Sequence, residues 1–178
     1  MGAFHSGVLL QMFSRIPVRF LGLALFATFA ALLAVGLYLQ HVKGIEPCPM
    51  CIMQRYAMMV CGVLGLIAGL HNPRGRGILV YAALLTVSAL AGAGIAARQS
   101  WMQWYPPAVS ECGPGLEYML ESFPLSSALP MIFRGAGDCS AIDWTLLGLT
   151  IANWSFLVFI SILVGVTIFL LQRHKNQR

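Results

Sequence analysis

Two of the five cysteines lie three positions apart, in Cys48-Pro49-Met50-Cys51. A Cys-x-x-Cys pair can exchange disulfides, because its thiols can bond to each other and one of them attacks as the thiolate. Arg55 follows Cys51 by four residues, so in a helix it lies on the same face, about 6 Å further along the axis. A helix that begins at the pair adds the partial positive charge of its N-terminus. Both features favour a thiolate, and we predict a redox-active pair.

The same spacing also begins many zinc sites, and Cys112 and Cys139 supply two further thiols. A zinc site with four thiolates usually contains a second Cys-x-x-Cys, whereas Cys112 and Cys139 are 27 positions apart. The sequence therefore favours disulfide chemistry without a metal. A membrane protein that handles metals stays as the alternative, and it could also use the methionines Met50, Met53, Met58 and Met59.

The elements that must position these cysteines lie in a membrane. Of the 178 residues, 58% are hydrophobic and 10% are charged, and the mean hydropathy is +0.78. A soluble domain carries about one-quarter charged residues, and disordered chains, collagens and small disulfide-stapled domains have other compositions again. The composition therefore excludes these classes and predicts an integral membrane protein. The net charge of +5 does not require a nucleic-acid partner, because membrane orientation also accounts for an excess of basic residues.

Four stretches are long enough to cross a bilayer, which takes about 20 apolar residues. We predict an all-α membrane protein with a single domain over residues 1–178, a bundle of four transmembrane helices. The expected spans are residues 18–39, 52–71, 77–97 and 145–171. The first stretch could instead be a secretory signal, but its apolar core is about twice as long as a signal usually has. An uncleaved anchor is therefore expected.

Basic residues predict the orientation. Four spans place both termini and the connection near residues 72–76 on one side, which holds seven Lys and Arg and no acidic residue; the other side holds four basic residues and all six acidic ones. By the positive-inside rule, the termini are then cytoplasmic and the loops 40–51 and 98–144 are periplasmic. The expected location is the bacterial inner membrane, with four cysteines on the oxidising side. The fifth, Cys61, is predicted to pack inside a helix.

The long loop is predicted to begin with an aromatic segment at the membrane interface, residues 101–107, followed by a break in the helix. Further along, apolar residues recur at helical spacing, which favours a short amphipathic helix on the membrane surface. These residues are Leu116, Met119, Leu120 and Phe123. An ordinary lid over the bundle is the alternative.

Arg55 is the one Lys, Arg, Asp or Glu in the second predicted span. An arginine at the centre of a membrane helix costs about 2.5–3.5 kcal/mol, and less near an end, where it can reach the interface. An anchor at the outer surface is thus one interpretation. The position of Arg55 one turn after Cys51 favours another, a lipid-soluble electron acceptor with carbonyl oxygens, such as a quinone.

Taken together, these features resemble the family of disulfide bond formation protein B, DsbB, over nearly the whole chain. The resemblance rests on residues 47–56 (PCPMCIMQRY), on Gln103-Trp104-Tyr105-Pro106, on Cys112 and Cys139 with Gly137-Asp138 before the latter, and on four spans of this orientation. It implies an enzyme, a thiol:quinone oxidoreductase that reoxidises a periplasmic DsbA-like oxidase with a thioredoxin fold. The electrons would pass to ubiquinone or menaquinone.

The resemblance also implies roles for single residues. Cys112 would form the mixed disulfide with the partner, Cys139 would exchange with Cys48, and Cys51 would be the thiolate that faces the quinone. Arg55 would bind the quinone and stabilise charge on it and on the thiolate.

One position departs from the pattern. Gln99 occupies a place where some members have a histidine near the quinone, which leaves its role open, although an amide can still donate a hydrogen bond. Two other interpretations remain: a bundle whose disulfides only stabilise it, and a related quinone-reducing enzyme, either of the vitamin K epoxide reductase type or a DsbB paralogue with a dedicated partner.

Overall fold

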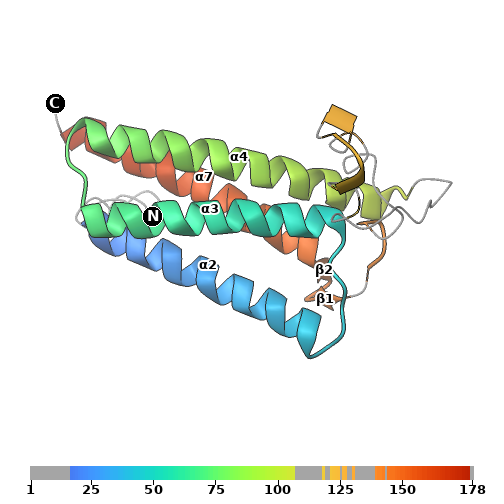
Figure 1. The fold of residues 1–178 in the computed structure, drawn as a ribbon. Helices are drawn as coiled ribbons and strands as arrows, with labels where there is room; N and C mark the ends of the chain where they lie inside the picture. Colours follow the sequence, from blue (N-terminus) through green and yellow to red (C-terminus); the bar gives the residue numbers. More distant parts are fainter. Residues whose placement is uncertain are drawn as a thin grey trace, which may run out of the picture.

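Four long helices make up most of the protein. The computed structural model describes residues 17–106, 118, 121–124, 126–127, 130, 139–142 and 144–176. In these ranges the long helices are α2 (Val18–His41), α3 (Pro49–His71), α4 (Arg76–Trp104) and α7 (Ile151–Asn176). Each is long and apolar enough to cross a membrane, and Figure 1 shows them running alongside one another. The predicted all-α membrane bundle of four helices is confirmed.

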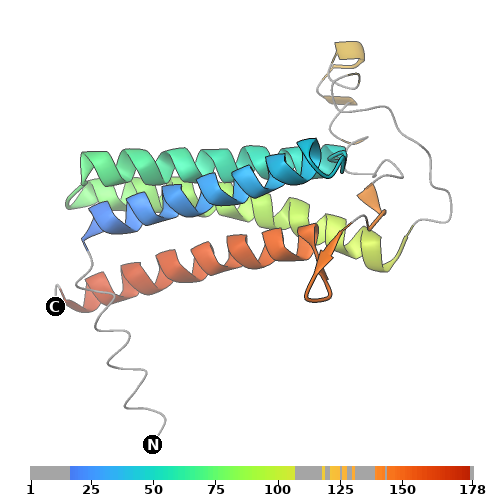
Figure 2. The same cartoon turned by 90° about the horizontal axis from the view of Figure 1, so that it is seen from below.

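Helix α3 packs against α2 and α4, and α4 also packs against α7. The start of α2, the connection between α3 and α4 and the end of α7 lie at one end of the bundle (Figure 1). The connection between α2 and α3, the end of α4 and the start of α7 lie at the opposite end, also in the second view (Figure 2). The helices therefore alternate in direction, and the segment that carries Cys48 meets the ends of the other three helices.

Helix α4 is longer than the predicted span. It continues to Trp104, seven residues beyond residue 97, and ends before Pro106. The predicted loop 98–144 therefore begins with two turns of helix, and Trp101 is still helical. The rings of Trp101 and Tyr105 lie 4.7 Å apart at the helix end. The helix break before the prolines agrees with the prediction.

Helix α7 begins later than predicted, at Ile151 instead of residue 145. The six residues before it form an antiparallel hairpin of β1 (Thr145–Leu146) and β2 (Leu149–Thr150). Its two turn residues, Leu147 and Gly148, both have positive φ, 54° and 78°, as the type I′ turn of a two-residue hairpin requires. The Thr150 hydroxyl then accepts a hydrogen bond from the backbone N–H of Asn153 and so caps the start of α7.

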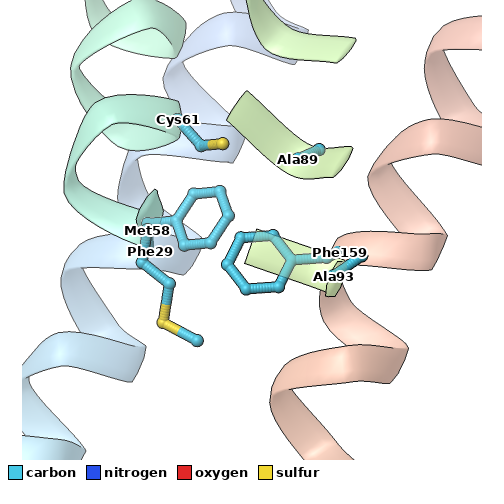
Figure 3. Close-up of a cluster of buried hydrophobic side chains, with 6 residues drawn as sticks. All are labelled: Phe29, Met58, Cys61, Ala89, Ala93 and Phe159. Carbon is cyan, nitrogen blue, oxygen red and sulfur yellow. The ribbon is translucent and has the colours of Figure 1, made fainter. Parts of the chain in front are cut away.

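The middle of the bundle is filled by one cluster of buried side chains (Figure 3). It contains Phe29, Met58, Cys61, Ala89, Ala93 and Phe159. The rings of Phe29 and Phe159 face each other with centroids 6.4 Å apart. Cys61 is completely buried beside them, which confirms its prediction as a packed residue.

Helices α2 and α3 touch through glycines. A Cβ atom on Gly22 would lie 2.5 Å from the Gly65 carbonyl oxygen and 2.7 Å from the Gly69 backbone nitrogen. Gly65 and Gly69 form a G-x-x-x-G pattern, which lets membrane helices approach backbone to backbone. This crossing holds α2 against α3, far along the bundle from Cys48.

Candidate active site

The Cys-x-x-Cys pair lies at the N-terminus of α3. Cys48 is the N-cap residue and Pro49 follows at the first helical position, where its fixed φ suits a helix and its missing N–H leaves no donor unpaired. The Cys48 sulfur accepts a hydrogen bond from the backbone N–H of Cys51 at 3.3 Å, as the oxygen of a capping serine would. The predicted position of the pair at a helix start is confirmed.

Cys48 and Cys51 are present as two thiols in contact. The Cys48 thiol donates a hydrogen bond to the Cys51 sulfur at 2.8 Å. Because the N-terminus of α3 carries a partial positive charge, the Cys51 sulfur receives both a hydrogen bond and a favourable field. Negative charge is therefore stabilised on the Cys51 sulfur.

Cys139 joins this pair from a segment far along the chain. Its side chain is completely buried and belongs to the same apolar cluster as Cys48, Met50, Ile95 and Met102. The pKa of the Cys48 thiol is raised well above its usual range. The largest cause is hydrogen bonding with Cys139, followed by hydrogen bonding with Cys51 and by burial. The protonated form of Cys48 is therefore favoured.

Other predicted residues of the long loop lie outside the described residues. Cys112 is among them, and so are Gly137 and Asp138. Of the predicted surface helix, Leu116, Met119 and Leu120 also lie outside, while Phe123 is described and exposed.

Two buried glutamines complete the surroundings of the thiols. Gln99, on α4, donates hydrogen bonds from its amide nitrogen to the sulfurs of Cys48, at 3.3 Å, and Cys51, at 3.1 Å. Gln54, on α3, donates to the Gln99 amide oxygen at 2.5 Å. The sequence left the role of Gln99 open and gave Gln54 no role. The feature that could have identified Gln54 was its amide side chain, which lies in a stretch that is mostly apolar apart from Arg55.

The Arg55 guanidinium is partly buried and reaches across to α2. It donates from Nη1 to the Gln40 side-chain oxygen at 2.6 Å and from Nη2 to the Gly36 carbonyl oxygen at 3.1 Å. Both acceptors lie in the last turns of α2, where the partial negative charge of a helix C-terminus attracts a cation. Arg55 thus ties α3 to α2 at the level of the cysteines.

A cavity of about 400 Å³ opens beside these groups, between the ends of the four helices. Cys51, Arg55 and Gln99 lie on its wall, and most of the other lining side chains are apolar, among them Leu32, Leu39, Trp154 and Val158. The hairpin lines it as well and is fixed by two hydrogen bonds, from Thr150 to Gln103 and from the Trp154 ring to the Leu146 carbonyl. Volume and lining are those of a site for a small, largely apolar molecule.

Known proteins match nearly the whole chain. Residues 18–169 match the family model described as disulfide bond formation protein DsbB. Disulfide bond formation protein B of Azoarcus sp. (strain BH72) is 73% identical over 141 residues, 79% of this chain and 85% of the relative. The proteins of the same name from Aromatoleum aromaticum and Polaromonas sp. are 58% and 52% identical, over 89% and 95% of this chain and 95% and 99% of the relatives. The chain therefore belongs to the DsbB family of membrane disulfide bond formation proteins.

Proposed function

We propose that this protein is a thiol:quinone oxidoreductase that reoxidises a periplasmic DsbA-like dithiol oxidase. The observation that carries the proposal is a series of sulfur contacts, from Cys139 to Cys48 to Cys51, that ends at an apolar cavity with Arg55 on its wall. Thiol–disulfide exchange needs one sulfur to reach another directly. This series supplies a path for electrons from the long loop into the bundle.

The exchange is proposed to begin from the disulfides Cys112–Cys139 and Cys48–Cys51. A thiolate of the reduced partner attacks Cys112, which breaks the first disulfide and releases Cys139 as a thiolate. Cys139 attacks Cys48 and releases Cys51. The second thiol of the partner then displaces Cys112, which returns to Cys139 and frees Cys48. In the net reaction, the partner dithiol becomes a disulfide, and Cys48 and Cys51 hold the two electrons and two protons.

The surroundings of the two inner sulfurs give this exchange a direction. A disulfide opens faster when its leaving sulfur is stabilised as a thiolate. Cys51 has that support from the Gln99 amide and from the start of α3, whereas Cys48 favours the protonated form. Attack at Cys48 with departure of Cys51 is therefore the favoured step, and it delivers negative charge to Cys51, which lines the cavity together with Arg55.

The cavity suits a quinone ring. A bound quinone supplies an acceptor for two electrons and two protons. Arg55 would hold a carbonyl oxygen: a guanidinium has five N–H groups, and the bonds to α2 use two of them. Val158 on the wall also lines a second apolar cavity, of about 820 Å³, between α2 and α7, which would accommodate an apolar tail.

The energetics favour a membrane acceptor. DsbA has a potential near −120 mV, and an ordinary structural disulfide, below about −300 mV, would be about 8 kcal/mol too reducing to oxidise it. Removal of the electrons by a quinone pool overcomes this difference. It also gives a reason for placing the enzyme in a membrane, since the thiols of the partner are in water and the acceptor is in lipid.

The orientation follows from the charges at the two ends. Arg74 and Arg76 adjoin the connection between α3 and α4, and Arg173, His174 and Lys175 lie in the last turn of α7 at the same end. By the positive-inside rule this end is cytoplasmic and the cysteine end is periplasmic. We therefore place the protein in the inner membrane with both termini in the cytoplasm.

The direct test is quinone reduction by the purified protein supplied with a reduced DsbA-like partner. Cys51→Ser should abolish turnover, while Cys61→Ser, which changes a packed thiol away from the site, should retain most of it. Turnover by Cys51→Ser would overturn the proposal. So would stoichiometric zinc in a purified protein whose loop thiols stay reduced after exposure to quinone, since that result would favour a metal site.

A further inference from the structure

The amide of Gln99 is shared between the two sulfurs of the reactive pair. Its nitrogen is 3.3 Å from the Cys48 sulfur and 3.1 Å from the Cys51 sulfur, and the side chain is 3% exposed. A primary amide has two N–H donors, so each sulfur can receive one. Hydrogen bonds are electrostatically stronger in a buried place of low dielectric constant, and each donor therefore contributes more than it would at a surface.

Gln54 determines which end of that amide faces the sulfurs. An amide can rotate by 180° and present either its oxygen or its nitrogen. The Gln54 amide nitrogen donates to the Gln99 oxygen at 2.5 Å, and Gln54 is 2% exposed. With the oxygen of Gln99 occupied in this way, its N–H groups point toward the sulfurs. Rotation would break this bond and place an oxygen against two electron-rich atoms.

We propose that Gln99 is a catalytic residue that stabilises the reduced Cys48–Cys51 pair, and that Gln54 is the positioning residue that keeps the Gln99 donors on the sulfurs. This inference rests on the proposed function, because it concerns the same pair of thiols. It adds a determinant of their reduction potential that lies on α4 and is separate from Arg55.

The chemistry of an amide gives this arrangement two consequences. A donor to a thiolate stabilises the reduced form, so it makes the disulfide a stronger oxidant. An amide also has no proton to lose between pH 5 and 9, unlike an imidazole at the same place. The support from Gln99 is therefore the same on both sides of neutrality, and protons must leave the pair by another group.

The test measures the equilibrium of the Cys48–Cys51 disulfide with glutathione in the full chain, freed of quinone. The test protein carries Cys112→Ser and Cys139→Ser, so that Cys48 and Cys51 are the loop cysteines that remain to react with glutathione. The balanced reaction is one protein disulfide plus two glutathione giving the dithiol and one glutathione disulfide. Gln99→Leu should lower the equilibrium constant for reduction of the disulfide about tenfold. The reduction potential of the pair should then be about 30 mV more negative. The Cys51 alkylation rate at pH 7 should fall by a similar factor.

A double-mutant cycle separates positioning from packing. Gln54→Leu should shift the equilibrium in the same direction as Gln99→Leu, and it should have no further effect once Gln99 is leucine. The matched control is Gln103→Leu, one turn further along α4, whose amide bonds to Thr150 and Ala141. It should lower thermal stability and leave the equilibrium constant unchanged.

The outcomes distinguish this inference from the proposed function. If the test protein forms no Cys48–Cys51 disulfide with oxidised glutathione, the proposed function itself fails. If it forms one, and Gln99→Leu moves neither the equilibrium nor the alkylation rate, the proposed function stands and the role of Gln99 is refuted. Additive effects of Gln54→Leu and Gln99→Leu would refute the positioning role of Gln54.

Discussion

Cys139 is completely buried and hydrogen-bonded with Cys48, although the two residues are 91 positions apart in the sequence. One belongs to the segment before the hairpin and the other caps α3. Their contact joins the second loop to the Cys-x-x-Cys pair, which the sequence could only suggest through a family resemblance. It also means that the proposed exchange between these two sulfurs needs no large movement of either backbone segment.

The contact predicts a disulfide that can be trapped. In a Cys51→Ser, Cys112→Ser variant, mild oxidation should link Cys48 to Cys139 in most molecules, because each has lost its other partner and the two sulfurs already adjoin. Peptide mapping by mass spectrometry would detect the bridge. A variant that also carries Cys139→Ser leaves Cys48 with Cys61, which lies in the separate central cluster, and should form no bridge within the chain. If the Cys48–Cys139 bridge does not form in the first variant under mild oxidation, the geometry is contradicted.

Arg55 is predicted to act on quinone affinity. Arg55→Ala should raise the KM for quinone about tenfold or more, since a hydrogen bond from a charged donor contributes about 1.5–3 kcal/mol. Arg55→Lys keeps the charge but loses the fork of donors, and its KM should lie in between. Gln40→Ala removes one acceptor that holds the guanidinium and should have a smaller effect. If Arg55→Ala changes only expression or insertion, Arg55 is an interfacial anchor.

The raised pKa of the Cys48 thiol predicts a pH profile for alkylation. Since iodoacetamide attacks thiolates, the rate at Cys48 in the reduced protein should stay low from pH 6 to 9, and its midpoint should lie above that range. In the denatured protein the midpoint should return to about 8.5. Poor access alone would lower the rate at every pH without moving the midpoint. A native midpoint near 8.5 would therefore contradict the assignment.

Much of the fold could be predicted because a bilayer demands about 20 apolar residues for each helix. Hydropathy marks where a helix leaves the membrane, however, and not where the helix ends. Polar residues end the apolar run at residue 97, yet α4 continues to Trp104, because Gln99 and Gln103 have partners inside the protein. For the same reason the hairpin before α7 was missed, since it depends on a turn at Leu147 and Gly148 that apolar composition conceals.

The site was predictable in part, through the spacing of Cys48, Cys51 and Arg55. Gln54 and Gln99 are 45 positions apart, and nothing in their spacing indicates that they meet. Their pairing depends on how α3 and α4 lie against each other. The available sign of such a pairing was an amide side chain in a membrane helix. Burying an amide without a partner is costly, so each such residue has to be matched with another polar group.

The crossing of α2 and α3 gives a prediction for stability. Gly22→Ala places a Cβ 2.5 Å from the Gly65 carbonyl oxygen, and backbone atoms in two packed helices cannot move aside independently. The helices must separate, and the free energy of unfolding should fall by about 1–3 kcal/mol. Thermal unfolding in detergent would show a lower midpoint. Gly94→Ala is the matched control, since its Cβ meets nothing within 4 Å, and alanine is a better helix former than glycine. The midpoint of Gly94→Ala should therefore stay the same or rise, and equal losses in the two variants would show that the crossing is looser than the glycines indicate.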